Sequence, residues 1–167
     1  MPKVAIVMGS KSDLPVVEET INVLKEFDIE VEARVMSAHR TPDEAASFAK
    51  QAKEKGFEVI IAAAGKAAHL PGVLAAYTTL PVVGLPIKSS TMDGLDSLLS
   101  IVQMPSGIPV ATVAINGGKN AALMAVEILA IKYEEVSNKL SEYRRSMAED
   151  VRRQDEELQR EGDTSLC

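Results

Sequence analysis

The chain has 167 residues, 46% hydrophobic and 25% charged, and a formal net charge of -6 at pH 7. This length fits one domain with a proper core, and an acidic chain without a basic, aromatic-rich stripe argues against a nucleic-acid partner. The single cysteine, Cys167, is the last residue, so we predict neither a disulfide framework nor a metal site of Cys/His spacing. No stretch fits a membrane span or a signal peptide, and we therefore expect a cytoplasmic protein.

Five short apolar segments alternate with helical patterns along the chain. The predicted strands cover residues 4–8, 29–36, 57–63, 80–85 and 109–115, and the helices after them begin near Ser12, Thr41, Leu74, Leu95 and Asn116. This alternation predicts a parallel sheet with helices on both faces, joined by right-handed crossovers. We expect a three-layer flavodoxin-like α/β sandwich with strand order 2-1-3-4-5, in which a ligand binds beyond the carboxyl ends of the strands.

The last part of the chain has a different pattern. Residues 134–161 predict a long, highly charged helix with an apolar stripe, which consists of Val136, Leu140, Tyr143, Met147 and Val151. We assign residues 1–131 to the α/β unit and residues 132–167 to a helical extension of the same domain. The stripe either folds back on its own sheet or contacts a neighbouring subunit. We favour the subunit contact because the stripe extends beyond the five strand–helix units.

The loops after the first three predicted strands bring polar residues to the same edge of the sheet. The first loop, residues 9–13, offers serine hydroxyls and free backbone N–H groups at a helix start, where a phosphate binds readily. It has neither the Walker A nor the Gly-x-Gly-x-x-Gly spacing, which argues against nucleoside triphosphates and dinucleotides. Asp13 at its end either caps the helix or binds a ribose hydroxyl.

The second loop, residues 37–42, has the sequence SAHRTP and contains His39 and Arg40. A neutral imidazole exchanges protons near pH 7, and a guanidinium suits a phosphate. Thr41 and Glu44 have the spacing of a capping box for the next helix. An ordinary solvated loop is the alternative interpretation.

The third loop, residues 64–69, contains the second histidine, His69. We favour a structural role for His69, bonded to backbone, over catalysis. Three further charged residues on later loops are weaker candidates for the site, namely Lys88, Asp93 and Lys119. Because no Ser-His-acid or Cys-His set stands out, we predict proton-coupled rearrangement or lyase chemistry on a small phosphorylated molecule, without a metal or redox cofactor.

Four segments resemble the class I N5-carboxyaminoimidazole ribonucleotide mutases of purine biosynthesis, also called the catalytic subunit of phosphoribosylaminoimidazole carboxylase. They are residues 8–13, 37–42, 67–72 and 97–105, and the likeness covers residues 3–131 in order. The resemblance implies an isomerase with lyase-like chemistry, which moves the carboxyl group of N5-carboxyaminoimidazole ribonucleotide to ring carbon C4 through trapped CO2. It implies no ATP, metal or organic cofactor, and a homo-octamer with sites at subunit borders.

The same resemblance implies roles for individual residues. His39 is the implied proton carrier, which first protonates towards the departing carbamate and later removes the C4 proton. Ser10, Ser12 and Arg40 are implied to hold the 5′-phosphate, and Asp13 the ribose hydroxyls. The remaining implied substrate-binding residues are Ser37, Ala38, Gly65, Lys66, Ala67, His69 and Leu70.

Lys66 departs from the family pattern, which usually has Gly-Gly-Ala-Ala-His where residues 65–69 read GKAAH. If the family's glycine has a positive φ, Lys66 strains the turn; if not, its ammonium faces solvent or reaches the substrate carboxylate. Two other functions stay open beside the mutase. One is direct carboxylation of aminoimidazole ribonucleotide by CO2. The other is a non-catalytic flavodoxin-like module for a flavin or a phosphorylated signal, although 4% aromatic residues offer few rings for stacking.

Overall fold

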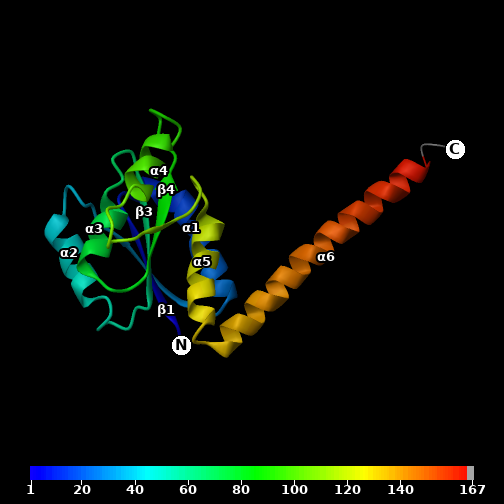
Figure 1. The fold of residues 1–167 in the computed structure, drawn as a ribbon, viewed down its shortest axis with the longest axis horizontal. Helices are drawn as coiled ribbons and strands as arrows, with labels where there is room; N and C mark the ends of the chain where they lie inside the picture. Colours follow the sequence, from blue (N-terminus) through cyan, green and yellow to red (C-terminus); the bar gives the residue numbers. More distant parts are fainter. Residues whose placement is uncertain (165–167) are drawn as a thin grey trace.

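A computed structural model describes residues 1–164, and in it a five-stranded parallel sheet lies between two layers of helices (Figure 1). The strands are β1 (Lys3–Met8), β2 (Glu30–Val35), β3 (Val59–Gly65), β4 (Val82–Ile87) and β5 (Ala111–Thr112). The helices are the 3-10 helix η1 (Lys11–Asp13), α1 (Leu14–Glu26), α2 (Pro42–Gln51), α3 (Leu70–Tyr77), α4 (Leu95–Val102), α5 (Gly118–Ala130) and α6 (Glu134–Thr164). The strand order β2-β1-β3-β4-β5 confirms the predicted order. Cys167 lies outside the described residues.

Alternate residues of the central strands face two separate apolar cores. Val4 and Ile6 of β1 lie in a core with α1 and α5, whereas Ala5 and Val7 lie in a core with α2 and α3. Figure 1 shows these two helix pairs on opposite sides of the sheet. Because both faces of β1 and β3 are buried, these strands are continuous apolar runs in the sequence.

Helices α1 and α5 approach each other closely through Gly118. A Cβ atom at this position would lie 2.6 Å from the carbonyl oxygen of Val16. The buried hydroxyl of Thr20 donates to the carbonyl oxygen of Gly118 at 3.0 Å, so the start of α5 is fixed against α1. This contact holds the α1–α5 layer on the sheet.

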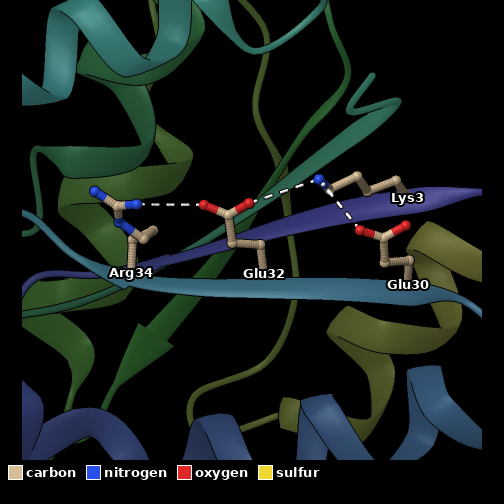
Figure 2. Close-up of polar contacts among 4 residues, drawn as sticks. All are labelled: Lys3, Glu30, Glu32 and Arg34. Atoms are coloured by element: carbon tan, nitrogen blue, oxygen red, sulfur yellow. Dashed lines mark hydrogen bonds and ion pairs between the residues drawn. The ribbon is translucent and has the colours of Figure 1, made fainter. Parts of the chain in front are cut away.

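Strand β2 lies at an edge of the sheet and has a row of charges on one side (Figure 2). Lys3 of β1 lies opposite Glu30 in the register, and its ammonium is 3.2 Å from Glu30 and 3.6 Å from Glu32. Arg34 pairs with Glu32 at 3.3 Å. Charges in such a row hinder association with the edge of another sheet. They also account for the alternating polar pattern that predicted this strand.

Helix α3 and strand β5 differ most from the sequence prediction, and β3 and β4 each lie two residues further along the chain than predicted. Helix α3 begins at Leu70 rather than Leu74, with Pro71 in its first turn, where a missing N–H costs no hydrogen bond. Strand β5 is limited to Ala111–Thr112 rather than residues 109–115. It pairs only with β4, so its ends have one neighbouring strand to hold them.

Helix α6 projects away from the rest of the domain (Figure 1). In its first turns Val136 is buried, and Leu140 and Tyr143 pack against the core beneath α5. Further along, Met147 is 51% exposed and Val151 is 65% exposed. The first half of the apolar stripe therefore folds back on its own domain, whereas the second half is exposed in the single chain. Within residues 1–164, no helix has the length and apolar character needed to cross a bilayer.

Candidate active site

A cavity of about 500 Å³ lies at the carboxyl edge of the sheet, between the loops that follow β1, β2, β3 and β4. Its lining residues are Gly9, Ser10, Ser12, Asp13, Ser37, Ala38, His39, Arg40, Ala64, Gly65, Lys66, Ala67, His69, Leu70, Ile87, Lys88, Ser89 and Ser90. All residues that the sequence predicted for the site lie in this lining, although their individual roles stay predictions.

The first loop is held by Ser10 and Asp13. Asp13 Oδ2 accepts a hydrogen bond from the Ser10 backbone N–H at 3.2 Å, and Ser10 Oγ accepts the Ser12 N–H at 3.3 Å. Burial raises the pKa of the Asp13 carboxyl, despite the hydrogen bonds from Ser10 and Ser12, which lower it. Asp13 thus completes a capping box with Ser10 around η1 but makes no cap hydrogen bond to α1, and it also lines the cavity.

The second loop is organised by Ser37 and Thr41. Ser37 Oγ accepts the backbone N–H of His39 at 3.3 Å and that of Arg40 at 3.1 Å. Thr41 Oγ1 accepts the backbone N–H of Ser37 at 2.9 Å. The predicted capping box of Thr41 and Glu44 is therefore wrong, because the threonine hydroxyl is engaged inside the loop and makes no cap hydrogen bond to α2.

The two histidines of the chain meet in the cavity wall. His39 Nε2 lies 2.8 Å from His69 Nδ1, and the rings meet edge to face with their centroids 4.9 Å apart. The His69 ring thus contacts another imidazole and not backbone as predicted, whereas the choice between a structural and a catalytic role for His69 stays a prediction. In such a pair one nitrogen donates and the other accepts, so the contact fixes the orientation of both rings. The loops after β2 and β3 are joined at this point.

Lys66 has a left-handed backbone conformation, with φ of +54°. Its carbonyl oxygen accepts the N–H of Ala68 at 2.8 Å and lies 3.5 Å from the hydroxyl of Ser100 in α4. A left-handed conformation costs a non-glycine residue about 1 kcal/mol. The turn at Lys66 is therefore strained, which agrees with the first of the alternatives drawn from the sequence.

The cavity lining is locally positive although the chain as a whole is acidic. Its charged side chains, apart from the histidines, are three cations and one carboxylate, namely Arg40, Lys66, Lys88 and Asp13. The guanidinium of Arg40 donates to the carbonyl oxygen of Gly9 at 3.1 Å, which ties the second loop to the first. Such a cluster of donors and cations attracts an anionic ligand on an acidic protein.

The family model described as AIR carboxylase matches residues 3–150. The chain belongs to the AIR carboxylase family. It is 63% identical over 147 residues to an N5-carboxyaminoimidazole ribonucleotide mutase of Pyrococcus abyssi, covering 88% of this chain and 84% of that protein. It is 55% identical over 162 residues to the mutase of Thermotoga maritima, covering 97% and 95%. A crystal structure of Treponema denticola PurE aligns with a TM-score of 0.88 at 32% identity, covering 95% of this chain and 99% of that chain.

This member of the AIR carboxylase family has a fourth cavity wall that sequence reasoning missed, residues 87–90. Helix α4 fixes that segment, because Ser97 donates to the Ile87 carbonyl oxygen and Ser89 donates to Asp96, both at 2.8 Å. Lys88 had been noted only as a weak signal. The strand order could have predicted this wall, because the loop follows β4 and the carboxyl ends of parallel strands share one edge of the sheet.

Proposed function

We propose that this chain is a mutase that converts N5-carboxyaminoimidazole ribonucleotide to 4-carboxyaminoimidazole ribonucleotide in purine biosynthesis. The observation that carries the proposal is the position of His39 in the wall of the cavity that Ser10, Ser12 and Arg40 also line. An acid–base group and a set of phosphate donors therefore face one ligand-sized space. The relatives at 63% and 55% identity, both named as this mutase, support the same substrate.

The phosphoribosyl part of the substrate binds at the loops after β1 and β2. The hydroxyls of Ser10 and Ser12 and the guanidinium of Arg40 donate to the 5′-phosphate, which favours charge-assisted hydrogen bonds. The Asp13 carboxylate accepts hydrogen bonds from the ribose hydroxyls. Arg40 is already oriented by the Gly9 carbonyl oxygen, so little side-chain freedom is lost when the nucleotide binds.

His39 moves one proton in each half of the reaction. In the first half the N–C bond of the carbamate breaks, CO2 is released, and the exocyclic nitrogen takes a proton from His39. In the second half C4 forms a bond to the carbon of CO2, and His39 takes the proton that C4 loses. The proton count therefore balances, and the reaction requires no ATP, metal or organic cofactor. His69, 2.8 Å away, holds the His39 ring in orientation throughout.

The intermediate CO2 must stay in the cavity between the two steps, because free CO2 escapes or hydrates. Short side chains in the wall, including Ala38, Ala64 and Ala67, let the backbone approach the imidazole ring of the nucleotide closely. We further propose that the protein is a cytoplasmic homo-octamer in which neighbouring subunits border the sites. The exposed apolar half of α6 supports assembly, since it lacks a partner in the described part of the single chain.

Supplying N5-carboxyaminoimidazole ribonucleotide without ATP or bicarbonate tests this function. We expect the 4-carboxy nucleotide to form, which is followed by its ultraviolet absorbance. If the chain instead consumes only aminoimidazole ribonucleotide with bicarbonate, it is the direct carboxylase. If it turns over neither nucleotide but purifies with a bound flavin, it is a flavodoxin-like binding module.

A further inference from the structure

We propose that Lys66 binds the carboxylate that migrates during the reaction and so strengthens the binding of carboxylated nucleotides. This inference rests on the proposed function, because the carboxylate belongs to its substrate and product. Lys66 has a strained backbone and lines the cavity, and the proton-transfer steps do not use it.

The strand order places Lys66 near the imidazole ring of the nucleotide rather than near its phosphate. The proposed phosphate donors lie on the loops after β1 and β2, whereas Lys66 follows β3, on the other side of β1 from β2. His39 and His69 meet between these two groups of loops. A nucleotide with its phosphate at Ser10 and its ring at His39 therefore extends its carboxylate towards the loops after β3 and β4.

Lys66 also differs from the other two cations of the lining, because each of those already has a partner in the protein. Arg40 donates to the Gly9 carbonyl oxygen at 3.1 Å, and the Lys88 ammonium is 3.1 Å from the carboxylate of Asp93. Among residues 1–160, the ammonium of Lys66 makes no hydrogen bond or ion pair. Asp13, the acidic residue in the lining, is engaged by the Ser10 N–H at the first loop.

The chemistry of a moving carboxylate favours a lysine at this position. The carboxyl group leaves the exocyclic nitrogen and re-forms on C4, so its counter-ion has to follow it across the ring. A lysine is a compact charge on a flexible stem with rotatable donors, whereas an arginine fork is rigid. The backbone beneath Lys66 is fixed, however, by Ala68 and Ser100 at its carbonyl oxygen. Only the side chain of Lys66 has to move.

Strain at this turn is the cost of retaining a side chain there. At φ of +54° a glycine would relieve this strain. A strained residue in a cavity wall indicates a functional role for its side chain. Binding a carboxylate supplies that role, because glycine has no charge to offer.

The test compares the binding of two nucleotides that differ only in the carboxylate. The variants are Lys66→Met, Lys66→Gly and Lys66→Arg, and the matched control is Lys53→Met, which removes an exposed charge outside the cavity lining. Calorimetry gives the Kd of 4-carboxyaminoimidazole ribonucleotide and of aminoimidazole ribonucleotide for each. We expect Lys66→Met and Lys66→Gly to weaken the carboxylated nucleotide about 10-fold, the effect of one charge-assisted hydrogen bond. The other nucleotide should change less than about 2-fold, which is within the effect of an exposed charge.

The Arg and Gly variants separate charge from backbone strain. Lys66→Arg keeps the positive charge and should keep the wild-type preference between the two nucleotides. Lys66→Gly should raise the urea concentration at the midpoint of unfolding, because the strain is relieved. It should also lose the part of the preference for the carboxylated nucleotide that Lys66 supplies. An unchanged preference in Lys66→Met overturns the proposal, and so does an equal loss of both nucleotides, which would assign Lys66 to the shared phosphoribosyl part. Failure of the wild type to bind either nucleotide rejects the mutase function itself.

Discussion

The carboxyl edge of the sheet and helix α6 differ in how their residues are partnered. At the edge, loops are bonded to one another, and Lys66, Asp93 and Asn116 have positive φ values. Along α6 the backbone is a regular helix, and cations such as Arg145 and Arg153 pair with carboxylates three residues away. Of the three edge residues with positive φ, Lys66 lines the cavity, and the fourth non-glycine residue with positive φ in residues 1–164, Asp28, precedes β2 at the opposite edge of the sheet, so strained backbone is not confined to the cavity. The exposed second half of the α6 apolar stripe, however, packs against nothing within the described residues.

The largest effect is expected at the edge, from His39→Asn. Asparagine keeps a polar side chain of similar reach but cannot transfer the proton, so kcat should fall by about 10²- to 10⁴-fold. The Kd for aminoimidazole ribonucleotide should stay within about 3-fold, since one neutral contact contributes little. Steady-state turnover and calorimetry measure the two quantities, and circular dichroism checks the fold. Near-normal kcat would assign proton transfer to another group, with His69 the nearest at 2.8 Å.

The same comparison predicts that α6 can be changed without altering the fold of the α/β body. The double variant Met147→Asp, Val151→Asp places two charges on the exposed half of the stripe. We expect it to dissociate the proposed assembly, because burying a charge in an apolar contact is unfavourable by several kcal/mol. Analytical ultracentrifugation measures the mass, and circular dichroism should be unchanged. The control Arg152→Asp changes an exposed neighbouring residue outside the stripe. If the double variant keeps the wild-type mass, the stripe is not the contact.

A smaller effect on stability is expected where α1 and α5 meet. Gly118→Ala places a Cβ 2.6 Å from the Val16 carbonyl oxygen, which is backbone and cannot move aside locally. We expect the free energy of unfolding to fall by about 2 kcal/mol. The matched control is Gly72→Ala, whose Cβ would lie 2.9 Å from the flexible thioether of Met104. Urea unfolding measures both, and equal losses would show that the rigidity of the neighbour is not what matters.

Much of the fold could be predicted because β1, β3 and β4 are apolar runs, β2 has an alternating pattern, and each crossover contains a helix. The strand order then placed the first three loops at one edge, and the structure brings Ser10, His39 and His69 to the same cavity. The fourth wall was missed because Lys88 and Ser89 look like ordinary loop residues, and only the position of β4 beside β3 brings them there.

Other features depend on competing hydrogen bonds or on the relative positions of loops and helices, which residue spacing does not predict. Thr41 has the spacing of a cap, but Ser37 lies four residues earlier and takes its hydroxyl. The sequence places the loops of His39 and His69 at the same edge of the sheet, but spacing along the chain does not predict the direct 2.8 Å contact between the two rings. The division of the α6 stripe between Tyr143, which is packed, and Met147, which is exposed, depends on the direction in which the helix leaves the domain.

The smallest expected effect is a pH dependence of the unfolding free energy, and it comes from Asp13 at the carboxyl edge of the sheet. Burial raises the pKa of its carboxyl above the ordinary value of 3.8, so between that value and its folded-state pKa the folded chain binds more protons than the unfolded chain. The contribution of Asp13 to stability is therefore fully present below pH 3.8 and is lost as the pH rises through the folded-state pKa.

Asp13→Asn removes this titration and keeps an oxygen that accepts the Ser10 N–H. The difference in unfolding free energy, wild type minus variant, should fall with rising pH from about 3.8 and then level off. Urea unfolding at a series of pH values measures this difference, in which the titration of all other groups cancels. A difference that rises over the same range would mean that the hydrogen bonds from Ser10 and Ser12 outweigh burial.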